Sequence, residues 1–194
     1  VGRAGLVTGK GDRLGWLGKG VLRAPEAAMK GLRAVGAVAV PVAENSNLVR
    51  VSFGLIGAEI GDAHLELLAP LSEQVTILGL ANTQVTDAGL ARLGMLSRLT
   101  RLHLGNTLIG DSGLQHLSKL ANLETLNVIN TQVTDSGLKS LKDLGRLRRL
   151  YGWQSQITRA GASALEDLIP ELEVGLGFEL SESASSDDVA NDVP

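Results

Sequence analysis

The stretch that decides the fold is residues 83–107, TQVTDAGLARLGMLSRLTRLHLGNT, which returns at 131–155 as TQVTDSGLKSLKDLGRLRRLYGWQS. With a step of 24 residues, one register holds only aliphatic side chains: Leu78, Leu102, Leu126, Leu150 and Val174. Apolar and polar residues alternate at the start of each unit, which predicts a strand. Leucines three residues apart fill the rest of each unit and predict a helix or a tight helical turn.

Four full units begin near residues 48, 75, 99 and 123, and a less regular fifth begins near 147. One unit cannot bury its own apolar face, whereas stacked units share a continuous core. The pattern therefore predicts a right-handed α/β solenoid of about five 24-residue repeats, with a parallel concave sheet and short helices on its convex side. It divides the chain into a glycine-rich basic arm at 1–24, a helix and strand cap at 25–47, the solenoid at 48–177 and an acidic disordered tail at 178–194.

The two quoted blocks resemble bacterial leucine-rich repeats with a T-x-V-T-D-x-G-L signature. These are similar to the cysteine-containing repeat class, with Thr in place of Cys. The closing block, residues 151–177, resembles the carboxy-terminal repeat of these proteins. The resemblance implies a leucine-rich repeat solenoid. It also implies an extracytoplasmic location, in the periplasm or at the cell surface, because such proteins of planctomycete-like bacteria are often secreted or periplasmic and often joined to a c-type cytochrome domain.

The composition excludes several classes of site. The chain of 194 residues is 44% hydrophobic but only 3% aromatic, so its core is built from aliphatic side chains. Without cysteine it has no disulfide, thiolate metal site or C-x-x-C-H haem attachment, and we expect no cofactor. Any electron-transfer role would have to come from a separate chain or a removed portion. The longest uncharged apolar run, Ala34 to Ala43, is too short for a membrane helix of about 20 residues.

Charge is distributed unevenly along the chain. Residues 1–24 hold five bases against one acid, residues 178–194 hold five acids and no base, and the formal net charge is −3. Nucleic-acid binding needs a sustained basic face, so we expect no nucleic-acid partner. The first residue is Val1 rather than methionine, which we expect to reflect a processed product or a fragment.

Two recurring polar positions are interpreted as structural. Asn82, Asn106 and Asn130 are predicted to turn inward and satisfy backbone groups where each strand leaves the sheet. Asp87, Asp111 and Asp135 stand beside the threonines at the predicted helix starts, where an acid suits capping. An acidic ladder invites comparison with a metal site, but capping alone explains the recurrence, and we expect no metal.

The outward positions of the strands differ from unit to unit, which is where a solenoid keeps its individuality. The predicted contact surface for a partner consists of Arg101, His103, Asn127, Arg149, Tyr151 and Trp153. Arginine, tyrosine and tryptophan are the side chains that most often anchor interfaces. The alternative is that Tyr151 and Trp153 cover the open end of the last regular unit, which the resemblance favours.

The amino-terminal flank supplies a second candidate surface. Residues 25–35 predict a short helix, and residues 37–42 predict an edge strand because Pro41 has no N–H to donate. In the preceding arm, the candidate docking motif is Arg13, Trp16, Leu17 and Lys19. The alternative is a solvated linker, which the glycine-rich composition favours.

No constellation of residues predicts catalysis. The glycines of the segment 8–15, TGKGDRLG, fit neither phosphate-loop pattern, and the histidines fall in unrelated positions of different units. We therefore expect a non-enzymatic module that binds another protein through its concave face. The alternative is an accessory subunit or cleaved domain of a larger extracytoplasmic or membrane-associated complex, held by the amino-terminal arm. A purely structural spacer is a third reading.

Overall fold

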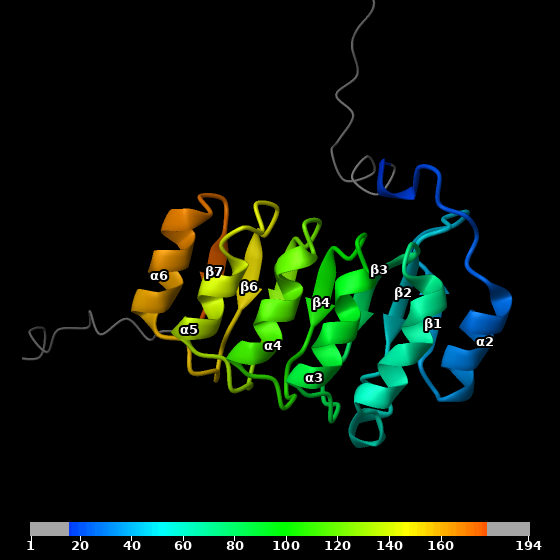
Figure 1. The fold of residues 1–194 in the computed structure, drawn as a ribbon, viewed down its shortest axis with the longest axis horizontal. Helices are drawn as coiled ribbons and strands as arrows, with labels where there is room; N and C mark the ends of the chain where they lie inside the picture. Colours follow the sequence, from blue (N-terminus) through cyan, green and yellow to red (C-terminus); the bar gives the residue numbers. More distant parts are fainter. Residues whose placement is uncertain (1–15, 178–194) are drawn as a thin grey trace, which may run out of the picture.

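The computed structural model describes residues 16–177, which form a sheet layer covered on one face by short helices (Figure 1). The strands follow chain order across the sheet, with β1 antiparallel to β2 and each later pair parallel. Their bounds are β1 Val38–Pro41, β2 Val49–Ser52, β3 Val75–Gly79, β4 Arg101–His103, β5 Thr125–Asn127, β6 Arg149–Tyr151 and β7 Glu173–Gly175.

Each connection between parallel strands carries one or two short helices on the same side of the sheet (Figure 1). The α-helices are α2 Glu26–Ala34, α3 Asp87–Leu90, α4 Asp111–Gln115, α5 Asp135–Leu138 and α6 Arg159–Leu168. The 3-10 helices are η1 Gly57–Glu59, η2 Asp62–Leu71, η3 Ala91–Met95, η4 His116–Lys119 and η5 Lys139–Leu141. Among residues 16–177, no helix has the length and apolar character needed to cross a membrane. The sheet face away from these helices is called the concave face below.

The predicted 24-residue register is confirmed strand by strand. Leu78 pairs with Leu102, Leu102 with Leu126 and Leu126 with Leu150 along β3 to β6, and all four side chains are completely buried. The leucines of the helical parts face them, so a single apolar core runs from Met29 in α2 to Leu172 before β7. This continuous core is the reason that the separate units form one α/β leucine-rich repeat solenoid.

Both outer strands of the sheet are blocked by a charged side chain from the neighbouring helix. At β1, Arg33 of α2 donates to the Ala39 carbonyl through Nη2 at 3.1 Å. At β7, Glu166 of α6 accepts a hydrogen bond of 2.8 Å from the Val174 N–H. These contacts occupy backbone groups that an open edge would present to another strand, which is a common protection against edge-to-edge pairing.

The asparagine positions require a correction. Asn82, Asn106 and Asn130 have φ of 62°, 56° and 50° and are exposed, so they do not turn inward. Their amides form an outer ladder in which each Nδ2 donates to the preceding Oδ1 at 2.8 Å. The inward role belongs to the next residue in each unit, because the buried hydroxyls of Thr83, Thr107 and Thr131 donate to strand carbonyls three residues back. Asparagine tolerates positive φ better than most residues, which explains its place at the bend.

The aspartates lie in the first turn of α3, α4 and α5, as predicted, but their carboxylates bond to the following repeat. Asp111 accepts from both the backbone N–H and the hydroxyl of Thr134, each at 2.7 Å, and Asp135 grips Thr158 in the same way. The Thr158 hydroxyl, then its N–H, lowers the pKa of Asp135 below its ordinary value. We call this arrangement the aspartate clasp. At Gly110, which has no hydroxyl, the clasp keeps only the N–H bond to Asp87.

Candidate functional site

The concave face presents outward side chains in rows that cross the strands. The first row reads Arg50, Ile77, Arg101, Thr125, Arg149 and Glu173, and the second reads Ser52, Gly79, His103, Asn127, Tyr151 and Gly175. The structure therefore brings Arg101, His103, Asn127, Arg149 and Tyr151 onto one face of three neighbouring strands, and Trp153 lies two residues after the end of β6. Alternation along each strand places these residues opposite the buried leucines.

The arginines of the first row differ from most arginines elsewhere in the described chain. Arg33, Arg92, Arg98 and Arg148 each form an ion pair with a glutamate, at 2.7–3.5 Å. Within residues 16–177, no ion pair or hydrogen bond involves the side chains of Arg50, Arg101 or Arg149. We call these three residues the arginine row. They occupy alternate strands, so neighbouring members are about 9.5 Å apart at the backbone.

His103 and Asn127 are half-buried between the exposed members of the surface. Burial lowers the pKa of His103, and the charges of Arg101 and Arg50 lower it further, so the imidazole is neutral at pH 7. Asn127 uses its side-chain oxygen to accept a hydrogen bond of 2.9 Å from the Ile129 N–H. This bond fixes the chain as it leaves β5, which gives Asn127 a positioning role in addition to its place on the surface.

Tyr151 and Trp153 border an apolar hollow of about 500 Å³, completed by Ile129, Gly175 and Gly177. The two aromatic side chains are 39% and 50% exposed. A Cβ on Gly177 would lie 2.8 Å from Trp153 Nε1, so this glycine allows the indole to lie against the chain leaving β7. We call these five residues the aromatic hollow. Sequence reasoning missed its glycines, although Gly175 and Gly177 stand 24 residues after Tyr151 and Trp153 and so occupy the same positions in the next repeat.

The open end of the sheet lies beyond these aromatics. β7 pairs with β6 through Leu150 and Val174, and α6 packs beside it, so β6 is not the terminal strand. Tyr151 lies beside Gly175 of β7, and Trp153 lies beside Gly177 just after that strand. A smaller hollow of about 370 Å³ lies at that edge, between α6 and β7, and there Glu166 already accepts from Val174.

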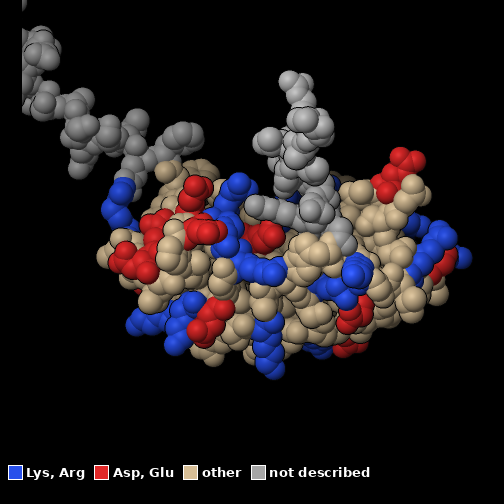
Figure 2. Space-filling view, turned by 90° about the horizontal axis from the view of Figure 1, so that it is seen from above, with Lys and Arg blue, Asp and Glu red and all other residues tan. Residues whose placement is uncertain are grey.

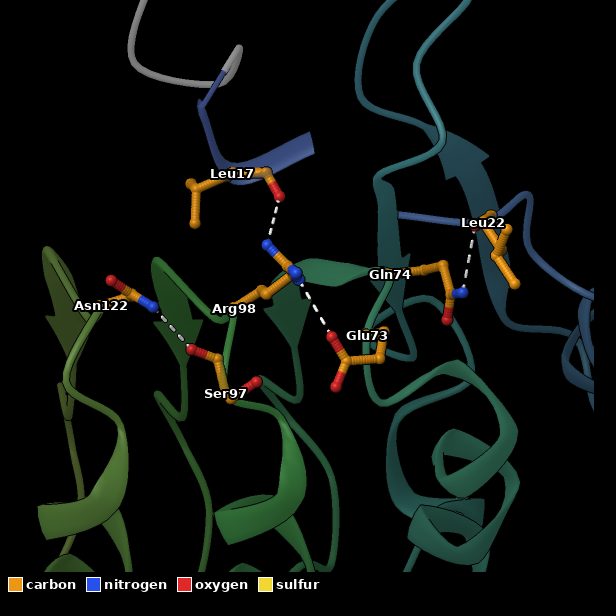
Figure 3. Close-up of polar contacts among 7 residues, drawn as sticks. All are labelled: Leu17, Leu22, Glu73, Gln74, Ser97, Arg98 and Asn122. Atoms are coloured by element: carbon orange, nitrogen blue, oxygen red, sulfur yellow. Dashed lines mark hydrogen bonds and ion pairs between the residues drawn. The ribbon is translucent and has the colours of Figure 1, made fainter. Parts of the chain in front are cut away.

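The second part of the predicted arm lies on the solenoid. Leu17 and Val21 are buried against Leu48, although glycine-rich composition favoured a solvated linker. Figure 3 shows Arg98 donating to the Leu17 carbonyl at 2.5 Å while also pairing with Glu73, and Gln74 donating to the Leu22 carbonyl. Since Leu17 is buried within its own chain, it is not available as an exposed docking side chain.

The other residues of the candidate docking motif have different surroundings. The Arg146 guanidinium stacks over the Trp16 ring at 4.4 Å from its centroid, which leaves the indole 46% exposed. Lys19 is exposed, and Arg13 lies outside the described residues. Acidic and basic side chains are interspersed on the face of the solenoid seen from above (Figure 2). The amino-terminal segment contacts Leu48, Gln74, Arg98 and Arg146, which come from different repeats. The segment therefore straps several repeats together.

The described residues contain no group of three or more histidine, aspartate and glutamate side chains arranged to hold a metal ion. At the start of η2, the Gly61 N–H donates a hydrogen bond of 3.2 Å to Nδ1 of His64. The side chains that the fold gathers are those of the arginine row, His103, Asn127 and the aromatic hollow. Large aromatics next to arginines are characteristic of protein interfaces.

Comparison with known proteins finds similarity in the fold. No protein-family model and no curated protein matches the chain. Among solved structures it is similar to internalin C2 of Listeria monocytogenes, with 26% identity over 56% of this chain and 44% of that one, at a TM-score of 0.46. It is similar to an internalin (inlF) of the same species, with 20% identity over 57% and 37% of the two chains, at a TM-score of 0.39.

A leucine-rich repeat protein of Leptospira interrogans is 19% identical over 54% of this chain and 26% of its own, at a TM-score of 0.42. The chain thus matches less than half the length of each of these three proteins. The architecture is established independently of these comparisons by the register of the strands, by the buried leucines and by helices that all lie on one face of the sheet. The chain is a leucine-rich repeat solenoid.

Proposed function

We propose that this solenoid is a non-enzymatic module that binds another protein through its concave face. The observation that carries the proposal is the exposed aromatic hollow beside Arg149, whose side chain forms no ion pair or hydrogen bond within residues 16–177. Hollows of about 300–1,000 Å³ are large enough to take a side chain or a small ligand, and the one at Tyr151 and Trp153 is of this size. A tyrosine and a tryptophan supply a large contact area at little cost in conformational entropy.

The proposal predicts that one double variant loses the partner. Arg149→Ala combined with Trp153→Ala removes an exposed charge and an indole but no buried core side chain. Used as bait in an extract of the source organism, this variant should retain any specific partner at least about thirtyfold less than the unmodified chain, because even one interface anchor of this kind is worth about 2 kcal/mol or more. Quantitative mass spectrometry measures the difference.

A matched control lies on the helical side. Arg92→Ala combined with Met95→Ala also removes one arginine and one partly exposed apolar side chain, and it should capture the same proteins as the unmodified chain. Circular dichroism shows that both double variants are folded. Equal recovery of every captured protein by the two variants would contradict the proposed function.

A further inference from the structure

The arginine row is the part of the concave face that indicates the chemistry of a partner. Its three guanidinium groups have no ion pair or hydrogen bond with any described residue, whereas Arg33, Arg92, Arg98 and Arg148 are each paired with a glutamate. Burial, followed by the charges of Arg101 and Arg50, lowers the pKa of His103, which disfavours a further positive charge beside the row. Glu173 lies beside Arg149 in the first row, so three arginines face one carboxylate and the described row keeps a net positive charge. An anionic partner would offset that charge.

The row also has a regular spacing. Its members lie in register on β2, β4 and β6, so they repeat about every 9.5 Å across the sheet. A polyproline II segment brings every third side chain to the same side at about 9.3 Å. A polypeptide with an acidic residue at every third position can therefore face all three arginines while it crosses the strands.

The aromatic hollow supplies the apolar part of the recognition. It lies next to β6, beside the last member of the arginine row, and its lining of Ile129, Tyr151 and Trp153 suits an aliphatic side chain. Nucleic acid could contact the arginines, but it could use the apolar hollow only by stacking a base there. The chain as a whole is acidic, with a formal net charge of −3, which disfavours nucleic acid. The charges and the hollow together favour a protein segment.

We propose, building on the proposed function, that the concave face binds an acidic segment of a partner protein. Carboxylates at every third residue contact Arg50, Arg101 and Arg149, and an aliphatic side chain near one end enters the aromatic hollow. The arginines give charge specificity, because like-charged segments are repelled. The hollow fixes which end of the segment lies at β6.

The test uses fluorescence anisotropy with the full chain and three labelled peptides. The first has three glutamates separated by two prolines each and a leucine at one end. The second has the same composition with the glutamates adjacent, and the third has lysines in place of the glutamates. We expect the spaced acidic peptide to bind about tenfold more tightly than the adjacent one and the lysine peptide not to bind. Raising the salt from about 50 mM to about 300 mM should weaken binding severalfold.

Paired variants separate the row from general surface charge. Arg50→Gln combined with Arg101→Gln should weaken the spaced peptide about tenfold, while Arg92→Gln combined with Lys142→Gln, which removes the same charge from the helical side, should leave it unchanged. Neither pair changes Arg149 or Trp153, the two residues whose substitution tests the proposed function. If the Arg149 and Trp153 variant loses its partner but no acidic peptide binds, the concave face is an interface and the acidic specificity is wrong.

Two other occupants are distinguished in the same assay. A labelled single-stranded DNA of about 20 nucleotides that binds as tightly as the acidic peptide would overturn the choice of a protein partner. The chain's own residues 178–194 carry Glu179, Glu182, Asp187, Asp188 and Asp192. A full-length variant replaces these five acids by the corresponding amides. If this variant binds the acidic peptide and the unmodified chain does not, residues 178–194 themselves occupy the concave face, which would also overturn the proposal.

Discussion

Replacing Leu126 by alanine is expected to lower the free energy of unfolding by about 2–5 kcal/mol, because the side chain is completely buried and the surrounding repeats can close the cavity only in part. Leu126 pairs with Leu102 on one side and Leu150 on the other, so the cavity would lie in the middle of the shared core. Urea denaturation followed by circular dichroism measures the change.

The control for this experiment is Leu168→Ala in α6, whose side chain is 61% exposed. That substitution should change the free energy of unfolding by no more than about 0.5 kcal/mol. Equal, small losses at Leu126 and Leu168 would mean that the leucine register does not form the continuous core described above.

The aspartate clasp gives the second large effect. A Cβ at Gly137 would lie 3.0 Å from Asp111 Cγ and 3.1 Å from Asp111 Cα, so Gly137→Ala must displace the carboxylate that holds Thr134. We expect a loss of about 2–4 kcal/mol, since two charge-assisted hydrogen bonds between repeats are broken or strained. Gly145→Ala, where a Cβ meets no atom within 4 Å among the described residues, should be neutral.

A double-mutant cycle identifies the clasp as the cause. On an Asp111→Ala background the added methyl group of Gly137→Ala has no carboxylate to displace, so its cost should fall to about 1 kcal/mol or less. An undiminished cost in that background would show that Gly137 is required for its backbone or for other neighbours, and that the clasp is not what the methyl group disturbs.

The repeat could be predicted from the sequence because its chemistry is periodic. A step of 24 residues fixes which leucines pair, and a one-residue slip would turn every strand's apolar side chains outward. The same periodicity could not assign the roles of Asn106 and Thr107. Both recur in three successive units, and only the backbone, with φ of 56° at Asn106, shows that the asparagine faces outward while the threonine hydroxyl is buried.

The less periodic parts were harder to predict for a physical reason. Leu17 packs against Leu48, and Arg98, 81 residues away in sequence, donates a hydrogen bond to the Leu17 carbonyl. Because both partners are distant in sequence, the residues of the arm alone could not predict these contacts. The aromatic hollow depends on two glycines that provide space rather than contacts. In contrast, Arg149, Tyr151 and Trp153 could be placed on the concave face from the strand alternation alone.

Site-specific photo-crosslinking tests the central claim, that the concave face is the binding surface, most directly. A photoreactive amino acid is placed at Thr125 on the concave face, at Leu168 on α6 or at Lys19 in the amino-terminal segment, and each full-length protein is irradiated in an extract of the source organism. We expect a specific covalent adduct with another protein from position 125 and none from position 168. An adduct from position 19 or 168, with none from 125, would contradict it and would locate the interface on the amino-terminal segment or the helical side.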